Sequence, residues 1–493
     1  MTAPLRLALF TDSAPQFLER ELTLMAQAQG GITLKTYAFT SPLAVLDELA
    51  SFAPDAILVW HCAEAMGAVD TPFPEALLQL PYTLLACTMV TRDDGTCGSS
   101  ALTWEGSLKW RIHAWNHRLI DLATRHANLH IIDLDGIQAR LGRANTFDAR
   151  LWEAAALALT PQAVQPFAKA IWQTLCALKG AVKKVLVTDL DNTFWGGITG
   201  EQGADAVNPD APGHAAYRAW VQRLATRGIL LAIASHNDRP AVEALFTQHA
   251  LGMQLSDFQH CEINWDPKPA MLKRIAAALN VSTDALVFID DRKEQREQVR
   301  AALPEVAVPE LPADPAQWLE FLAAENLFET PRITADDALR VQTFQAAAQR
   351  EAAAQTLSRE AYIASLAQEL IAEPLSAANL ERAAQLTQRC NRFNMRGTRH
   401  TTASLAGRTG WVYRLKDRFG DMGLISAVIL EGETIETWVM SCRVFNRDVE
   451  ALILAHLQSV THDLRGAYAP TERNAACAGV YAQFGILPPN PLT

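Results

Sequence analysis

Three things are scarce or missing in this chain of 493 residues, and each excludes a class of protein. No apolar run approaches the ~20 residues of a membrane span, and no signal peptide is seen, so we expect no membrane partner and a cytoplasmic location. The eight cysteines include no Cys-x-x-Cys pair, which indicates reduced thiols. The net charge of −11 leaves no basic surplus for neutralising phosphates, which disfavours a nucleic-acid partner.

What the chain does contain is enough apolar sequence for a large buried core. Hydrophobic residues make up 49% and charged residues 20%, values typical of folded globular proteins. The length allows about three domains. We find no internal repeat.

The clearest candidate for chemistry follows a short apolar run, Val185–Val187. A run without polar alternation predicts a buried parallel strand, and ligands bind at the carboxyl ends of such strands. This one ends on two carboxylates, Asp189 and Asp191. Asp189 could attack phosphorus while Asp191 handles the proton, and both could hold a divalent cation. The alternative is a turn stabilised by the two acids.

Two later apolar runs also end in polar residues. Gly228–Ser235 ends on Ser235 and is followed by His236 and Asn237, and the run starting at Ala285 ends on Asp290 and Asp291. The alternatives are ordinary, because Ser235 could cap a helix and Asp290 could be a loop acid. Carboxyl ends of parallel strands share one edge, so the joint arrangement predicts a single site.

A lysine completes this arrangement. Asp266 and Pro267 predict a helix start, which places Lys268 in the first turn of a helix that runs to about Asn280. The alternative is a solvated surface lysine. Together with the strand-end residues, Lys268 predicts a site for an anionic substrate, in which the acids gather a metal ion while Ser235 and Lys268 bind phosphoryl oxygens.

The order of these motifs over residues 183–311 resembles the haloacid dehalogenase (HAD) superfamily. The resemblance implies that Asp189 is the nucleophile and Asp191 the general acid/base. It implies a Mg²⁺ site made of Asp189, Asp191, Asp290 and Asp291. It further implies phosphate binding by a second group, which comprises Ser235, His236, Asn237 and Lys268.

The wording of two motifs is most similar to the FkbH-type subfamily: Asp-Leu-Asp-Asn-Thr-Phe-Trp-Gly-Gly from Asp189, and Ile-Asp-Asp from Ile289. This resemblance implies removal of phosphate from a three-carbon acyl phosphate, 1,3-bisphosphoglycerate. It also implies transfer of the glyceryl unit to a phosphopantetheinylated acyl carrier protein in polyketide biosynthesis. His236 stands where that subfamily usually has lysine, and Arg292 and Gln295 replace its asparagine and glutamate. These differences bear on the substrate more than on the phosphoryl chemistry.

Residues 1–150 predict a separate α/β domain, because apolar strands alternate with helical stretches. The strands expected are 5–10, 56–60, 82–88 and 129–134, with helices at 15–29 and 108–126. Asp12-Ser13, with Asn116, is vaguely similar to the SGNH hydrolases. No Asp-x-x-His near the end of the domain supplies a base, so we expect a non-hydrolytic domain in which Ser13 caps a helix. Residues 151–182 are expected to form a helical connector.

The HAD-like domain is expected at 183–330, with a flexible glycine-rich hairpin at 196–203 that could close over the site. The insertions are short, which predicts an uncapped site; the alternative is that the flanking domains act as the cap. A helical linker is expected at 331–372, because good helix formers dominate from Thr334 to Leu370.

Residues 373–493 resemble the GNAT acyltransferase fold, with a helix, antiparallel strands and a strand-loop-helix unit. Gly432 predicts the tight turn of a hairpin. The loop before the central helix has Asn446 and Asp448 where FkbH-type sequences usually have glycine. This leaves a carrier-protein pantetheine arm as the expected ligand. The residues that could bind it, as weaker candidates, are Arg443, Arg447, Asn474 and Tyr481.

Cys442 is a candidate acyl acceptor. Arg443 and the start of the next helix would favour its thiolate, which can form a thioester. The alternative is a packed cysteine at the end of a strand.

The sequence thus predicts an α/β protein. A HAD-like Rossmannoid three-layer core is preceded by an SGNH-like α/β domain and followed by a GNAT-like α+β domain. The predicted function is Mg²⁺-dependent dephosphorylation coupled to glyceryl transfer. The first alternative is a simple phosphatase whose terminal domains dock partners, and the second is a scaffold with an inactive site.

Overall fold

The computed structural model describes residues 4–27, 30–65, 75–199, 207–333 and 358–489. The chain separates into two compact units. One comprises Met1–Lys179 with Arg399–Gly407, and the other comprises Gly180–Thr398 with Arg408–Thr493. In the described residues, no helix is both long enough and apolar enough to cross a membrane.

The first unit contains a five-stranded parallel sheet with strand order β2-β1-β3-β4-β5. The three central strands are almost wholly buried, as their apolar sequences predict. The strand order reverses between β1 and β3: the chain places β2 on one side of β1, and then places β3, β4 and β5 in sequence on the other side. The strands are β1 (Leu5–Thr11), β2 (Ile32–Ala38), β3 (Ala56–Trp60), β4 (Thr83–Cys87) and β5 (Leu129–Ile132).

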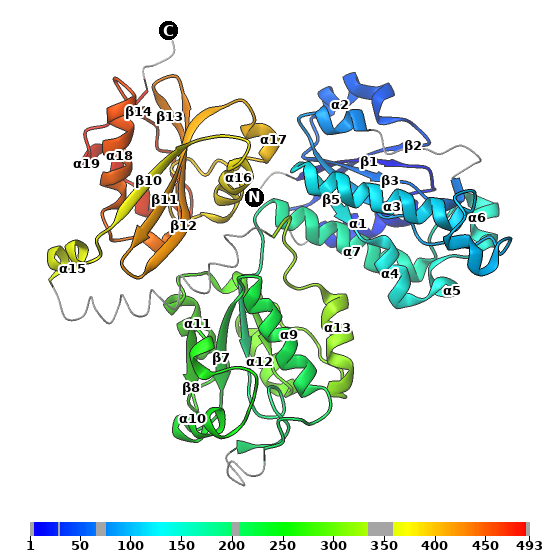
Figure 1. Cartoon of the computed structure of the whole chain (residues 1–493), viewed down its shortest axis with the longest axis horizontal. Helices are drawn as coiled ribbons and strands as arrows, with labels where there is room; N and C mark the ends of the chain where they lie inside the picture. Colours follow the sequence, from blue (N-terminus) through cyan, green and yellow to red (C-terminus); the bar gives the residue numbers. More distant parts are fainter. Residues whose placement is uncertain (1–3, 28–29, 66–74, 200–206, 334–357, 490–493) are drawn as a thin grey trace. The chain divides into compact units, whose positions relative to one another are not determined.

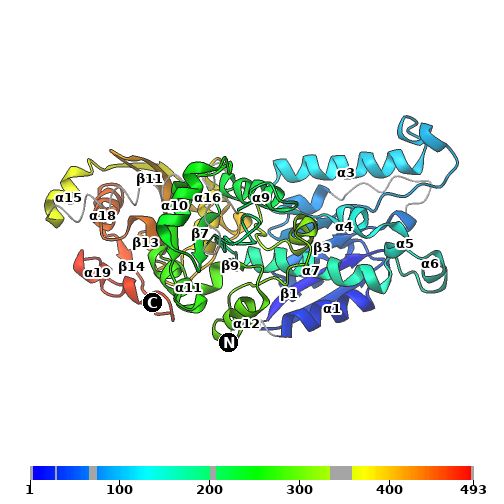
Figure 2. The same cartoon turned by 90° about the horizontal axis from the view of Figure 1, so that it is seen from below.

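Helices cover both faces of this sheet (Figures 1 and 2). On one face, α3 buries Ile112, Trp115, Leu119 and Leu122, a helical spacing that makes one apolar stripe. Ser107 caps this helix by accepting a hydrogen bond from Trp110 N. The helices of the unit are α1 (Gln16–Ala26), α2 (Leu46–Phe52), α3 (Leu108–Arg125), α4 (Leu134–Leu141), α5 (Arg143–Thr146), α6 (Ala149–Ala155) and α7 (Pro161–Leu178), with α17 (Thr402–Leu405) in the returning segment.

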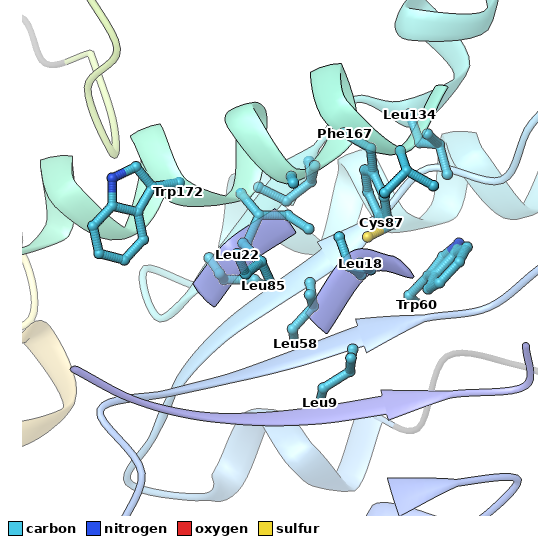
Figure 3. Close-up of a cluster of buried hydrophobic side chains, with 14 of the residues drawn as sticks. Leu9, Leu18, Leu22, Leu58, Trp60, Leu85, Cys87, Leu134, Phe167 and Trp172 are labelled. Carbon is cyan, nitrogen blue, oxygen red and sulfur yellow. The ribbon is translucent and has the colours of Figure 1, made fainter. Parts of the chain in front are cut away.

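Helix α7 was expected to be part of a connector, and that expectation is wrong. Its apolar face lies in the core of the first sheet, where Phe167 packs edge-on against Trp60 with ring centroids 5.1 Å apart (Figure 3). Trp172 of the same helix is buried in that cluster (Figure 3). The apolar stripe of α7 is therefore explained by burial against its own sheet rather than by a bridge between domains.

The second unit begins with a four-stranded parallel sheet, in the order β8-β7-β6-β9. Strand β6, the strand that precedes Asp189, is central and buried throughout. The strands are β6 (Val185–Thr188), β7 (Leu230–Ser235), β8 (His260–Ile263) and β9 (Leu286–Ile289).

Two apolar clusters lie on the two faces of this sheet and make a three-layer arrangement. Helices α9, α10 and α13 contribute to one cluster, and α11 and α12 contribute to the other. Their bounds are α9 (His214–Thr226), α10 (Arg239–Gln248), α11 (Lys268–Ala278), α12 (Lys293–Ala302) and α13 (Trp318–Glu325). This is the α/β class that the sequence predicted.

A second sheet follows in the carboxy-terminal part, in the order β10-β11-β12-β13-β14. Neighbouring strands are antiparallel, except that β13 and β14 are parallel and pair only at Thr434–Arg465 and Ile435–Gly466. Gly432, with φ +60°, makes the tight turn between β12 and β13 that its sequence position predicted. The strands are β10 (Glu369–Pro374), β11 (Thr409–Asp417), β12 (Gly420–Glu431), β13 (Thr434–Met440) and β14 (Arg465–Gly466).

Helix α18 (Val449–Val460) packs on one side of this sheet and α16 (Leu380–Arg389) lies on the other (Figure 1). Two short helices complete this part, α15 (Arg359–Ser365) and α19 (Val480–Gln483). Asn446 and Asp448, before α18, have φ values of +61° and +55°. The loop thus keeps the left-handed conformation that glycine adopts freely, with the two residue types that tolerate it best.

Two expectations about connecting segments fall partly outside the described residues. The glycine-rich hairpin includes residues 200–206, and the linker helix includes 334–357, which the structure does not describe. The end of that linker was predicted wrongly. Helix α15 ends at Ser365 and β10 begins at Glu369, so residues expected to be helical form the edge of a sheet.

Candidate active site

Strand-end residues of the four-stranded sheet meet as the sequence predicted. Lys268, the first residue of α11, places Nζ 2.6 Å from Asp189 Oδ1 and 3.1 Å from Asp290 Oδ2. Asp189 follows β6 and Asp290 follows β9, which is the neighbouring strand. The ammonium also donates to the carbonyl of Ala234 on β7. One buried lysine therefore connects the ends of three strands.

Asp291 joins this group through a threonine. Ligand oxygens of Asp189, Asp290 and Asp291 all lie within 4.8 Å of one another. Thr193 Oγ1 donates to Asp291 Oδ1 at 3.2 Å and accepts from Asp291 N at 3.1 Å. Thr193 is fully buried and belongs to the loop after β6, so the loop that carries Asp189 also orients Asp291.

Burial of three carboxylates in one place is electrostatically costly, and it raises the pKa of two of them, Asp290 and Asp291. Burial, and then the charge of Asp189, raise the pKa of Asp290 to about 7. The same two causes, in the same order, raise the pKa of Asp291 to about 6. Burial lowers the pKa of Lys268, but the negative charges of Asp189 and Asp290 outweigh it, and the net direction is upward. The ammonium thus stays charged.

These acids fit a divalent cation. Hard cations prefer carboxylate oxygens, and three such groups converge here. Oδ2 of Asp290 is buried and makes no hydrogen bond, although Lys268 lies 3.1 Å away. A cation bound by the three acids would satisfy that oxygen and offset the repulsion that raises the pKa values of Asp290 and Asp291.

Asp191 lies apart from the group formed by Asp189, Asp290 and Asp291, so its role as a metal ligand stays a prediction. Its Oδ1 accepts from Trp195 Nε1 at 3.0 Å and from Thr199 Oγ1 at 2.6 Å, and its Oδ2 accepts from Thr199 N. Since the carboxylate is not part of the converging group, a proton-transfer role remains for it. Trp195 and Thr199 fix its orientation, as an acid/base group requires.

Among the phosphate-binding candidates, the structure separates one from the rest. Ser235 and Asn237 are buried at the end of β7, where Asn237 Nδ2 donates to Ser235 Oγ. His236 instead bonds through Nε2 to the carbonyl of Asp266 and stacks on Trp265, with ring centroids 6.0 Å apart. The imidazole of His236 is thus engaged by the loop before α11 rather than by the carboxylates.

Sequence reasoning missed residues that hold the site together. Arg296 of α12 is buried and donates to the carbonyl oxygens of Asp290 and Asp291. Tyr217 of α9 is buried and donates to Thr188 Oγ1, one residue before Asp189. The only sequence signal was their place on the buried face of a helix, and this does not distinguish support of a site from ordinary packing.

The carboxy-terminal candidates fall into two groups. Cys442 is half-buried directly after β13, at the start of a short 3-10 turn. Arg443 Nε donates to Ser441 Oγ, so it is held beside the cysteine by its own turn. These two residues stay compatible with the expected role.

The other three candidates are buried within the fold. Arg447 pairs with buried Asp417 at 3.2 Å. Asn474 has no exposed surface. Its side-chain N–H groups donate to Asn394 O and Ala469 O, and its side-chain oxygen accepts from Thr471 N. Tyr481 is also buried, but its hydroxyl has no hydrogen-bond partner in the described residues. The structure therefore gives Arg447 and Asn474 structural contacts and leaves only the tyrosine hydroxyl unsatisfied.

Comparison with known proteins agrees with this description. Residues 75–176 match the family described as FkbH, N-terminal domain. A solved structure of the N-terminal part of protein BF1531 from Bacteroides fragilis, containing a phosphatase domain complexed with Mg, has a TM-score of 0.61 and 25% identity. The match covers 67% of this chain and 95% of that one. No curated protein matches.

Two further solved structures are too dissimilar to carry an argument. A peptidoglycan O-acetyltransferase catalytic domain from Streptococcus pneumoniae has a TM-score of 0.23 and 10% identity, and the match covers 35% of this chain and 92% of that one. A UDP-GlcNAc 2-epimerase from Neisseria meningitidis has a TM-score of 0.16 and 12% identity, with 66% and 95% covered.

The three-layer sheet with its strand-end acids defines a protein of the HAD type. Because residues 75–176 match the FkbH N-terminal domain and the similar solved structure contains a phosphatase domain, the protein is FkbH-like.

Proposed function

We propose that this chain is a Mg²⁺-dependent HAD-type phosphatase that acts on a three-carbon acyl phosphate, 1,3-bisphosphoglycerate, and passes the glyceryl unit to an acyl carrier protein. The observation that supports the phosphatase step best is the convergence of Asp189, Asp290 and Asp291 on Lys268. A Mg²⁺ complex of the similar phosphatase domain supports the choice of metal.

Phosphoryl transfer needs a nucleophile, positive charge and a proton donor. Asp189 attacks phosphorus, and the bond from phosphorus to the glyceryl oxygen breaks while Asp191 donates a proton to that oxygen. Water then attacks the aspartyl phosphate, Asp191 takes the proton, and inorganic phosphate leaves with Asp189 restored. Lys268, 2.6 Å from Asp189, neutralises the phosphoryl oxygens throughout.

The metal site would use the carboxylates of Asp189, Asp290 and Asp291. A bound Mg²⁺ supplies charge neutralisation for the phosphoryl oxygens. Thr193 and Arg296 orient Asp291 and the backbone of Asp290 for this purpose.

For the transfer step, the acyl phosphate bond is the activated one. A thiol sulfur attacks the carbonyl carbon, the bond to the phosphate oxygen breaks, and inorganic phosphate leaves with the thiol proton. Cys442 is our candidate for the first acceptor, and the pantetheine thiol of a carrier protein is the second. A GNAT-like role for residues 373–493 is supported by the order of its strands and by the short pairing of β13 with β14. All eight cysteines are free thiols, which is consistent with the cytoplasm.

The test is turnover of labelled 1,3-bisphosphoglycerate by the full chain, with Mg²⁺ and a phosphopantetheinylated carrier protein. Asp189→Asn should abolish release of the phosphate bonded to the glyceryl oxygen but not release of the acyl phosphate group, whereas Glu243→Gln, at an exposed ion pair of the same domain, should change neither. Cys442→Ala should abolish label on the chain and thiol-dependent release of the acyl phosphate group, while preserving release of the phosphate bonded to the glyceryl oxygen. If Asp189→Asn releases that phosphate at the original rate, the proposed nucleophile is wrong.

A plain phosphatase whose terminal domains dock partners is the second candidate. It is favoured by the internal contacts of Arg447 and Asn474, two residues expected to bind the pantetheine arm. Equal rates of phosphate release with and without carrier protein, and no label on either protein, would decide for it. A chain that gains no thermal stability from Mg²⁺ and shows no turnover would instead be a scaffold.

A further inference from the structure

The first unit contains a group of polar residues at the reversal point of its sheet, distant in sequence from the residues above. In an open sheet with this strand order, ligands bind at the carboxyl ends of the strands where the order reverses. Here that point lies between β1 and β3. Asp12 directly follows β1, and His61 and Cys62 directly follow β3.

An aspartate-histidine pair is fixed at this point. His61 Nδ1 lies 3.1 Å from Asp12 Oδ2, and the backbone N–H and thiol of Cys62 both donate to Asp12 Oδ1. In the tautomer of the neutral imidazole that donates to this carboxylate, Nδ1 carries the proton and Nε2 is an acceptor. Within the described residues Nε2 has no hydrogen-bond partner, and the imidazole is partly exposed.

Two arginines lie beside the pair, around a buried acid. Glu64 is one 3-10 turn after Cys62, and its side chain is only 4% exposed. Arg92 and Arg143 approach it at 3.6 and 3.9 Å, which is longer than a hydrogen bond. Both guanidinium groups also pack on the ring of Phe147, at 5.6 and 4.8 Å from its centroid. The arginines are therefore held in place while most of their donors stay available.

The polar groups of this cluster that remain available to a ligand are cationic donors, together with one neutral acceptor. Glu64 is buried, and the carboxylate of Asp12, whose side chain is 24% exposed, already accepts hydrogen bonds from Cys62 and lies against His61. The groups left to bind a ligand are the two guanidinium groups and Nε2 of His61. Guanidinium forks match carboxylate and phosphate oxygens, and a bare imidazole nitrogen accepts from a hydroxyl group.

Serine-hydrolase chemistry does not explain the cluster. Ser13, expected to cap a helix, instead donates to Ala156 O and accepts from Ala158 N, so that expectation is wrong. Helix α1 begins after Pro15 without a side-chain cap. Ser13 is fully buried and tied to the segment after α6, so it is no available nucleophile. The aspartate-histidine pair consequently has no serine to activate.

We propose that the reversal point of the first sheet is a second ligand site, which binds a small hydroxylated oxyanion. Arg92 and Arg143 hold the carboxylate or phosphate group, and His61 Nε2 accepts a hydrogen bond from a hydroxyl of the same molecule. Asp12 is a positioning residue that fixes the ring of His61.

Isothermal titration calorimetry on the full chain in EDTA, with the Asp189→Asn substitution to silence the other site, tests this with four probes. Glycerate and glycerol phosphate carry both groups, propionate lacks the hydroxyl, and glycerol lacks the charge. Saturable binding of at least one of the first two, with propionate weaker and glycerol absent, is expected. The tighter of the two identifies the anion as carboxylate or phosphate.

Variants locate the binding. Arg92→Gln and Arg143→Gln should each weaken it at least ~10-fold, because each removes charge-assisted hydrogen bonds. Arg150→Gln, a neighbouring arginine that is 90% exposed, should not change it. If either variant fails to fold, the ring signal of His61, assigned by its loss in His61→Gln, should still shift when ligand is added to the folded chain. The site would be overturned by any of three results: no saturable binding, an affinity in both arginine variants equal to that of the parent chain, or a His61 signal that does not move when ligand is added.

Discussion

Thr193 and Asp291 bond to each other twice, although 98 positions separate them in the chain. The threonine hydroxyl donates to the carboxylate and accepts from the backbone N–H of the same aspartate. Partners of this kind, which hold a metal ligand in position, typically change metal affinity 10- to 100-fold when they are removed. The pair therefore connects the loop of the nucleophile to the proposed metal site.

Replacing Thr193 by valine should weaken Mg²⁺ binding by roughly 10-fold or more, because the isosteric side chain loses both hydrogen bonds. The measurement is the Mg²⁺ concentration at half-maximal thermal stabilisation. Thr226→Val, at an exposed threonine of α9, is the matched control. An unchanged midpoint in Thr193→Val would show that Asp291 does not bind the ion.

Lys268→Met should destabilise the metal-free protein by about 3–5 kcal/mol. The substitution leaves two buried carboxylates without their shared cation, which is the costly way to break a buried ion pair. Urea unfolding measures this loss, and added Mg²⁺ should recover part of it while activity stays absent. Lys273→Met, at an exposed lysine on the same helix, should cost little. A loss that Mg²⁺ does not reduce would contradict a shared role for lysine and metal.

The raised pKa values of Asp290 and Asp291 predict a pH dependence. Both acids hold protons more tightly in the folded chain than in the unfolded chain, where aspartate titrates near ~3.9. Their contribution to stability is therefore present at low pH and is lost as pH rises through about 6 and about 7. The melting temperature of the metal-free protein should fall across this window from their contribution.

The stabilisation by Mg²⁺ should correspondingly increase over the same window, because the cation replaces the protons. Melting curves with and without Mg²⁺ at several pH values measure both effects. Asp290→Asn should flatten the metal-free profile. A Mg²⁺-induced shift that is constant from pH ~5 to ~8 would rule out these carboxylates as the titrating ligands.

Phe167→Ala should destabilise the first unit by about 3–5 kcal/mol, the usual cost of deleting a buried phenylalanine ring. Its ring is fully buried against Trp60, in the cluster that α7 shares with the sheet. Leu24→Ala on α1, a leucine that is largely exposed, is the control. If unfolding of the first unit is unaffected, α7 does not belong to its core.

Asn446→Gly should maintain or raise stability by up to ~1 kcal/mol, whereas Asn446→Ala should lower it by ~1 kcal/mol. The positive φ of this residue suits glycine, is tolerated by asparagine and strains alanine. Thermal unfolding of the two variants measures the difference. The reverse order of stabilities would mean that the loop before α18 adopts another conformation in solution.

The sequence predicted continuously apolar strands well and partly buried edge strands poorly, for one physical reason. Strand β3 was expected at the residues where it lies, because both of its faces are buried and its sequence is continuously apolar. Four strands were not foreseen, β2, β8, β10 and β14, and all of them lie at the edge of a sheet and are only partly buried. The edge strand β9 was foreseen because it is apolar and buried throughout. A partly buried edge strand shows no such run, so its pattern does not stand out.

The same contrast holds for the site. Asp189, Lys268, Asp290 and Asp291 were predicted because strand ends and a helix start place them by simple rules. That the Asp191 carboxylate lies outside this group was not predicted, because its direction depends on Trp195 and Thr199, which fold back from the following loop. Side-chain direction after a turn is set by tertiary contacts, and residue spacing does not reveal it.

The place of α7 in the first core decides where this protein can be divided. A fragment that started at residue 151 would lack the leucines that pack against Phe167 and Trp172. The apolar face of α7 would then be exposed to solvent, and we expect the fragment to aggregate. A fragment that stopped at residue 150 would lack α7, and the face of the first sheet that α7 covers would be exposed to solvent. Cutting after Lys179 keeps both halves of the apolar surface together, so the phosphatase part can be studied alone only from that position onward.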